Sequence, residues 1–125
     1  MKHTCCFCGH SEIKTISLPI LKKTISKLVK QKGVMHFYSG HKGEFDNLCE
    51  KVVLKLKKCY PQIRLYWVIP YRTKALEDEV ICSRFDDIIF PELRHFRKYA
   101  IFERNRWMVD HSLYVISFLH RQSRA

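Results

Sequence analysis

The segment Ser39-Gly40-His41-Lys42-Gly43 joins an apolar run to an amphipathic helical pattern and carries two of the chain's four glycines. A helix N-terminus presents unpaired N–H groups and roughly half a positive charge. Glycine lets the backbone approach an anion closely, and Lys42 adds a full positive charge. These residue types therefore suit a phosphate cradle, although the glycines equally suit a tight strand-to-helix turn. The segment matches neither G-x-x-x-x-G-K-[ST] nor G-x-G-x-x-G, so the standard nucleotide fingerprints do not apply.

Further polar segments follow other apolar runs, at 9–11 and 70–72, and a later helical pattern carries Arg104 and Asn105. In open parallel sheets, ligands bind beyond the carboxyl ends of the strands, near the topological switch point. We therefore expect these segments and the 39–43 loop to surround one ligand site.

The elements that must position these residues are read from hydrophobic periodicity. Helical spacing covers 18–32, closed by Gly33, as well as 44–59 and 96–111, with a weaker acidic candidate at 73–83. Short strand patterns cover 4–8, 34–39, 63–69, 87–90 and 113–119. Several strands are apolar along both faces, as in sheets covered on both sides. The alternation predicts a three-layer, Rossmann-like α/β fold with a five-stranded, mostly parallel sheet flanked by helices. We expect one domain over 1–125, with a frayed basic tail at about 120–125.

The composition limits the classes of function. The chain has 125 residues, of which 46% are hydrophobic, and a formal net charge of +11. The charge favours anionic partners, and Lys51, Lys55, Lys58 and Arg64 suit a basic surface for nucleic acid, or else a merely solvated helix face. No transmembrane run or signal peptide is recognisable, so we expect a cytoplasmic location and no membrane partner. A homo-oligomer is left open.

The six cysteines do not form a persuasive metal or disulfide pattern. Cys5 and Cys8 have C-x-x-C spacing, but both fall in a predicted strand, where they would point to opposite faces. No second cysteine pair with zinc spacing follows. We therefore predict no metal site and no resident cofactor.

Three segments together resemble one family. "TCCFCGH", "FYSGHKGEFDNLCEKVVLKLKKCYPQIRLYWVIPY" and "ERNRWMVDHSLYVISF" occur in this order and cover most of the chain. They resemble the conserved blocks of the YpsA-like branch of the SLOG superfamily, which is related to the LOG phosphoribohydrolases. The resemblance implies a Rossmann-like fold that holds a nucleotide or a nucleotide-derived ligand.

The family's ligand-contacting loops can be carried over to this chain. The resemblance implies a pocket formed by Gly9, His10, Ser39, Gly40, Gly43, Asp46, Arg104 and Asn105, and we add Lys42 because of its charge in the 39–43 loop. Asp46 would either bind a sugar hydroxyl or brace the loop. We expect the 39–43 loop to receive the phosphate and Arg104 to act as its charge partner.

The sequence also departs from the family pattern. Ser11 replaces the arginine that usually follows Gly-His, Cys8 replaces a threonine, and Leu113 stands where an aspartate is usual. The family's Gly-Gly-Thr phosphate loop, with the acid–base glutamate of the hydrolase branch, is not found before the sequence ends at Ala125. We therefore expect a non-catalytic sensor or regulatory module with no catalytic residues. The alternatives are a nucleoside-monophosphate N-glycosidic hydrolase or a basic nucleic-acid-binding accessory protein.

The aromatic residues, the histidines and the remaining carboxylates give only weak indications of a ligand site. Trp67 and Phe90 fall in predicted strands and suit the core, whereas Trp107 lies on the helix of Arg104 and could stack on a bound base. His41 lies on a loop where ligand contact is plausible. The carboxylates Glu103 and Asp110 share one helix face, which we expect to be solvated.

Overall fold

The computed structural model describes residues 3–9, 18–92 and 97–118. The five strands are β1 (Thr4–Gly9), β2 (His36–Ser39), β3 (Arg64–Val68), β4 (Asp87–Ile89) and β5 (Tyr114–Phe118). The helices are α1 (Leu18–Lys32), α2 (Glu44–Lys57), α3 (Glu79–Cys82) and α4 (Arg97–Asp110), with a 3₁₀ turn η1 (Lys74–Glu77). None of the helices in these ranges is long and apolar enough to cross a membrane.

The strands form one sheet in the order β4-β3-β2-β1-β5, and every pair of neighbours is parallel. The chain moves outward from β1 to β4 and then returns to add β5 on the other side of β1. The topological switch point therefore lies between β1 and β5, where Gly9 is paired with Phe118. The predicted three-layer, Rossmann-like α/β fold is confirmed.

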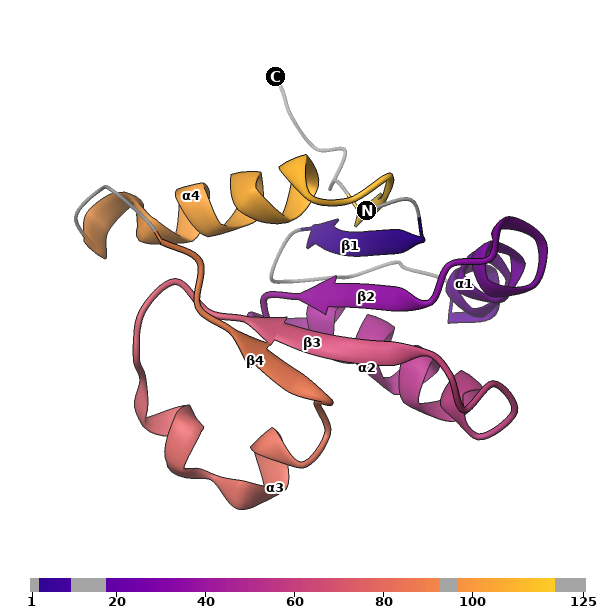
Figure 1. Ribbon diagram of the computed structural model, residues 1–125, viewed down its shortest axis with the longest axis horizontal. Coiled ribbons are helices and arrows are strands. Elements are labelled where there is room, and N and C mark those ends of the chain that lie inside the picture. Colours follow the sequence, from indigo (N-terminus) through magenta and orange to yellow (C-terminus); the bar gives the residue numbers. More distant parts are fainter. Residues whose placement is uncertain (1–2, 10–17, 93–96, 119–125) are drawn as a thin grey trace.

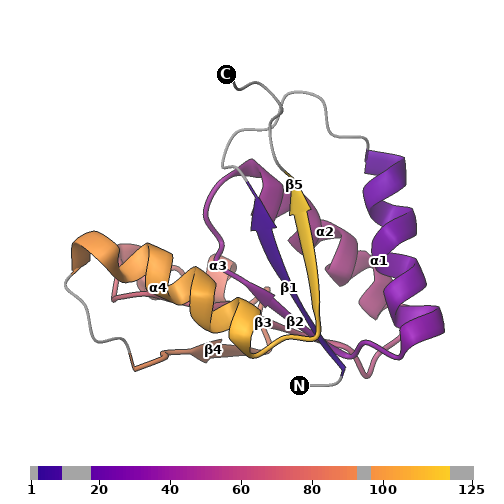
Figure 2. The ribbon, with the colours of Figure 1, turned by 90° about the horizontal axis from the view of Figure 1, so that it is seen from above.

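The helices divide between the two faces of the sheet. Figure 1 shows α4 on one side of the sheet and α1 and α2 on the other. Seen from the α4 side in Figure 2, β5 lies beside α4 rather than beneath it. The crossover that carries α4 is thus the one that changes face, and α4 covers only part of its face.

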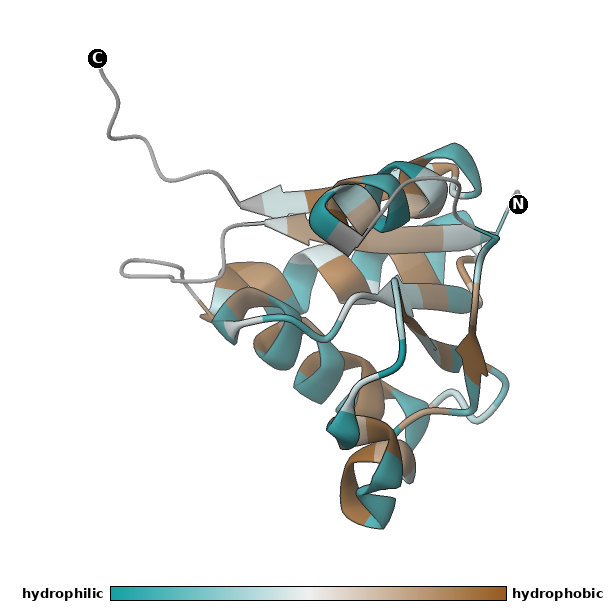
Figure 3. Cartoon of the chain, turned by 90° about the vertical axis from the view of Figure 1, so that its left-hand side faces the viewer, coloured by the Kyte–Doolittle hydropathy of each residue, from teal (hydrophilic) through white to brown (hydrophobic). Residues whose placement is uncertain are grey.

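Successive side chains of each strand point to opposite faces of the sheet, and this alternation forms two apolar cores. In β1, Cys5 and Phe7 join the large core under α1 and α2, whereas Cys6 joins a smaller core under α4 with Val68 and Met108. Cys8 packs against this smaller core, so the expectation that Cys5 and Cys8 point to opposite faces is confirmed. In Figure 3 the helices carry alternating brown and teal bands, as expected for elements with one face in a core and one in solvent.

The long helices lie close to where periodicity placed them. Helix α1 has the predicted bounds and is followed by Gly33, whose φ of 67° is the left-handed conformation that favours glycine. Helix α2 begins at Glu44 as predicted and ends at Lys57, two residues earlier than expected.

Two predictions between β3 and α4 were wrong. The expected helix over 73–83 is broken at Asp78, which is extended and caps α3 by accepting hydrogen bonds from the N–H groups of Val80 and Ile81. Phe90 lies beyond the end of β4 and is 52% exposed, with the Arg72 guanidinium 5.6 Å from its ring centroid. Phe90 is therefore a partner for a cation rather than a core residue.

Candidate functional site

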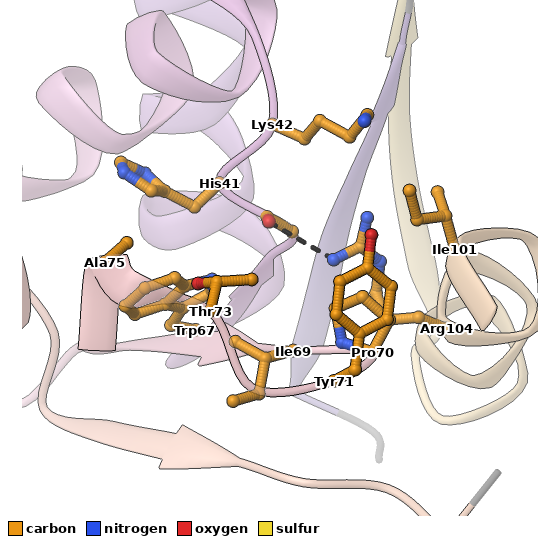
Figure 4. Close-up of a pocket in the computed structure, with 11 residues that line it drawn as sticks. His41, Lys42, Trp67, Ile69, Pro70, Tyr71, Thr73, Ala75, Ile101 and Arg104 are labelled. Atoms are coloured by element: carbon orange, nitrogen blue, oxygen red, sulfur yellow. Dashed lines mark hydrogen bonds between the residues drawn. The ribbon is translucent and has the colours of Figure 1, made fainter. Parts of the chain in front are cut away.

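A cavity of about 200 Å³ lies at the carboxyl ends of β2 and β3. Its walls come from the loop after β2, the loop after β3 and the inward face of α4. The lining residues include Gly40, His41, Lys42, Trp67, Ile69, Pro70, Tyr71, Ile101 and Arg104. In Figure 4 the Lys42 side chain extends across the cavity toward the side of Arg104 and Ile101, whereas His41 points the opposite way. The cavity lies at the expected edge of the sheet, although over β2 and β3 rather than at the switch point between β1 and β5.

Arg104 is the most unusual charged residue of this cavity. It is only 2% exposed, and its Nη1 donates to the carbonyls of Gly40 (3.2 Å) and Val68 (2.9 Å). Its Nε donates to Asn105 Oδ1 at 2.8 Å. Within the part of the chain that the structure describes, no carboxylate oxygen lies within 4.0 Å of the guanidinium. Burial lowers the pKa of Arg104, and the nearby charge of Asp46 offsets part of this effect.

The glycines of the 39–43 loop are explained by contacts within the chain. A Cβ at Gly40 would stand 2.6 Å from Arg104 Cζ, so this position must lack a side chain for the guanidinium to fit. Gly43 precedes the first residue of α2 with a φ of 99°, a conformation that side chains strongly disfavour. The tight strand-to-helix turn expected from the sequence thus accounts for Gly43, whereas Gly40 is explained by its close contact with Arg104.

Asp46 braces the loop. It is 8% exposed, and its Oδ2 accepts a hydrogen bond from the backbone N–H of Lys42 at 2.9 Å. Burial raises the pKa of this carboxyl to about 6. The backbone N–H of His41 is also used, because it donates to Ser39 Oγ at 3.1 Å. These contacts leave the side chain of Lys42, rather than these two amides, to face an anion in the cavity.

Sequence reasoning missed Glu50, which is 1% exposed. Its carboxylate accepts a hydrogen bond from Ser39 Oγ at 2.6 Å and lies 2.9 Å from His41 Nδ1. The His41 ring packs edge-on against Trp67 and Phe85, with centroids 5.2 and 5.4 Å apart. The position of Glu50 in the helical pattern could have indicated that it is buried, because it is four residues after Asp46 and beside the apolar stripe of α2. Ser39 is thus a buried support of the loop and not part of the cavity wall.

The remaining predicted site residues take other positions. Gly9 packs against Phe45, since a Cβ there would stand 2.6 Å from the Phe45 ring, and it does not line the cavity. Asn105 supports Arg104 through its Nε. His10 lies outside the described residues. The structure therefore brings Gly40, Lys42 and Arg104 together around the cavity.

Trp107 does not line the cavity. It packs against Tyr38, with ring centroids 5.4 Å apart, and stacks on His111 at 4.1 Å. The carboxylates Glu103 and Asp110 are also absent from the described cavity wall, and Asp110 is exposed.

Cys6 and Cys8 of β1 lie together on the α4 side of the sheet, and Cys8 is close enough to Arg104 to be affected by its charge. The pKa of the Cys8 thiol is lowered, first by a hydrogen bond from the Cys6 thiol and further by the charge of Arg104. The pKa of Cys6 is raised correspondingly, because Cys6 keeps its proton to donate to Cys8. Among the described residues, no three His, Cys, Asp or Glu side chains gather as metal ligands.

The chain has no match among protein-family models and none among curated proteins.

Proposed function

We propose that this chain binds a nucleotide or a nucleotide-derived ligand at the carboxyl ends of β2 and β3, as a non-catalytic sensor or regulatory module. The observation that carries the proposal is Arg104, a buried guanidinium beside a cavity, with Asp46 nearby but no carboxylate within 4.0 Å among the described residues. Burying a charge without a counter-charge in direct contact is costly. A phosphate in the cavity would supply that counter-charge.

Lys42 supports an anionic ligand independently. Its side chain reaches over the cavity from the loop after β2, so that two cations from distant parts of the sequence face one space (Figure 4). Convergent cations at the edge of a parallel sheet raise the local concentration of anions. The first turn of α2 contributes less than a bare helix end, because Glu44 and Asp46 already oppose its dipole.

The rest of the wall suits the base or sugar of a nucleotide. Trp67, Ile69, Tyr71 and Ile101 add apolar and aromatic surface to the cavity wall beside its cations. Small-molecule sites commonly combine such apolar walls with a few polar groups that fix orientation. At about 200 Å³ the enclosed space suits part of a nucleotide, with the remainder facing solvent.

The resemblance to the YpsA-like branch of the SLOG superfamily supports the same ligand class, since it implies nucleotide-derived ligands and includes Gly40 and Arg104. The proposal is for binding without cleavage, because the described wall offers cations and a histidine but no carboxylate. N-glycosidic cleavage requires a positioned carboxylate.

The experiment is a thermal-shift screen against mono-, di- and cyclic nucleotides, NAD-type compounds and ADP-ribose. A ligand present at about 100 times its Kd adds roughly 2.7 kcal/mol and raises the midpoint by several degrees. We expect one class of nucleotide to raise the midpoint for the wild type and much less for Lys42→Ala. The matched control is Lys30→Ala, which removes an exposed lysine from α1. Equal shifts for all three proteins would place the ligand elsewhere. Release of free base from a nucleoside monophosphate would favour the hydrolase instead.

A further inference from the structure

A second hollow lies between α1 and α2, in the helical layer opposite α4. It has a volume of about 400 Å³, and none of its lining residues contributes to the cavity at the strand ends. Its apolar part is formed by Leu18, Leu48, Val52 and Leu54. Leu18 is 42% exposed, so the apolar surface reaches solvent.

Four described lysines line the same hollow: Lys22 from α1, then Lys51, Lys55 and Lys58 along α2 and its C-terminal end. Among the residues that the structure describes, none of those lining the hollow is a carboxylate. Lys51, Lys55 and Lys58 are spaced by four and three residues, so they form one line on the helix surface. Like charges at these spacings repel one another and destabilise a helix. Acidic groups placed next to the lysines would offset this repulsion.

The acidic residues of these two helices do not offset the line of lysines. Helix α1 contains no acidic residue between Leu18 and Lys32. In α2, Asp46 and Glu50 are buried and hydrogen-bonded to the loop before the helix, whereas the exposed Glu44 is the first residue of the helix and is not among the described lining residues. The charge of the hollow is therefore uncompensated by the residues that line it.

We propose that this hollow is a docking groove for an acidic amphipathic helix of a partner protein. The lining residues from Leu48 to Lys58 span ten steps of helix, or about 15 Å, which matches about three turns of a helix laid alongside. Apolar side chains of the partner, spaced by three and four residues, would pack on Leu18, Leu48 and Leu54. Its carboxylates would pair with the four lysines, whose methylene stems extend the apolar surface.

The apolar surface distinguishes this partner from nucleic acid. Phosphodiester binding depends on the number of cations and needs no apolar surface between them. Arg64, which the sequence grouped with these lysines, lies outside the groove and donates to the carbonyls of Pro61 and Ile63. The groove thus combines four cations with leucines, which matches an amphipathic acidic helix better than a charged backbone.

The test uses a fluorescent peptide of about fourteen residues, with leucines spaced by three and four and glutamates elsewhere. A scrambled peptide of identical composition serves as its control. Fluorescence anisotropy should show saturable binding of the amphipathic peptide, about tenfold tighter than the scrambled one. Lys51→Glu with Lys55→Glu should weaken it by about tenfold or more, and Leu18→Ser should also weaken it.

The matched control is Lys23→Glu with Lys27→Glu, which makes the same change of net charge on exposed positions of α1 outside the groove. This variant should bind within about threefold of the wild type. The proposal is overturned if neither peptide binds, if the two peptides bind equally, or if the control variant loses as much affinity as the groove variant. It is also overturned if mixed-sequence RNA or anionic vesicles bind through Lys51 and Lys55 and exclude the peptide. Circular dichroism verifies that each variant is folded.

Discussion

The guanidinium of Arg104 lies directly against Gly40, although the two residues are 64 positions apart. Arg104 Nη1 donates to the Gly40 carbonyl, and the guanidinium occupies the space in which a side chain at Gly40 would begin. A second bond to the Val68 carbonyl joins the ends of β2 and β3 to α4. The same side chain therefore holds the carboxyl ends of two strands together and gives the cavity its buried charge.

Gly40→Ala should dislodge Arg104. The new Cβ would stand 2.6 Å from Cζ, so the guanidinium must move and its bonds to the Gly40 and Val68 carbonyls are lost. We expect a loss of about 1–3 kcal/mol in the free energy of unfolding, measured by urea denaturation. Gly40 does not have a positive φ, so the cost is steric and not conformational.

A double-mutant cycle separates this contact from general damage. In an Arg104→Ala background, Gly40→Ala should cost much less than in the wild type, because the clashing group is gone. Equal costs in both backgrounds would contradict the contact. Arg104→Ala removes two bonds to buried carbonyls, so only Lys42→Ala is suitable as a binding variant.

Asp46→Asn should stabilise the protein at neutral pH. Burial raises the pKa of Asp46 to about 6 in the folded state, from 3.8, so the folded protein holds this proton more tightly than the unfolded chain. The contribution to stability is therefore present at low pH and is lost as the pH rises from about 4 to about 6. An asparagine can still accept from the Lys42 N–H without carrying charge, so we expect a gain of up to about 3 kcal/mol at pH 7.5.

Urea denaturation at pH 4.5 and pH 7.5 measures the effect. The difference between Asp46→Asn and the wild type should grow from the lower to the higher pH. Asp110→Asn makes the same chemical change at an exposed position of α4 and serves as the control. A destabilisation by Asp46→Asn that is equal at both pH values would contradict this assignment.

Glu50 should be essential for the loop before α2. Glu50→Ala removes the acceptor of Ser39 Oγ and the partner of His41 Nδ1 at a site with 1% exposure. We expect a cost of about 2–4 kcal/mol in the free energy of unfolding. Glu50→Gln keeps an acceptor for Ser39 and should cost less. A Glu50→Ala protein as stable as the wild type would show that the three side chains do not act together.

Periodicity was sufficient to predict most of the fold. The apolar stripe in 44–59 packs into the core on one side of the sheet. The nearly continuous apolar runs at 4–8 and 63–69 contribute side chains to the cores on both sides. Such patterns repeat locally and can be read from a single sequence. The helix expected over 73–83 failed because a local hydrogen bond decided the outcome, with Asp78 capping a new turn instead of continuing the previous one.

The site was less predictable, because its contacts join residues far apart in sequence. The sequence indicated that Gly40, Lys42 and Arg104 belong together, on the strength of their segments and their place at strand ends. It could not show that Gly40 is small in order to admit Arg104. Nor could it show that Glu50 is buried beneath the loop, since one carboxylate beside an apolar stripe is usually solvated.

Trp67 provides the most direct test of a nucleotide-binding cavity. The chain has two tryptophans, and only Trp67 lines the cavity. In a Trp107→Phe protein, Trp67 fluorescence would be titrated with AMP, ADP-ribose and the strongest ligand of the thermal-shift screen. The account predicts a saturable change for at least one of them, weakened about tenfold or more by Lys42→Ala but not by Lys30→Ala. A folded protein whose Trp67 responds to none of these compounds, or responds equally with and without Lys42, would contradict it.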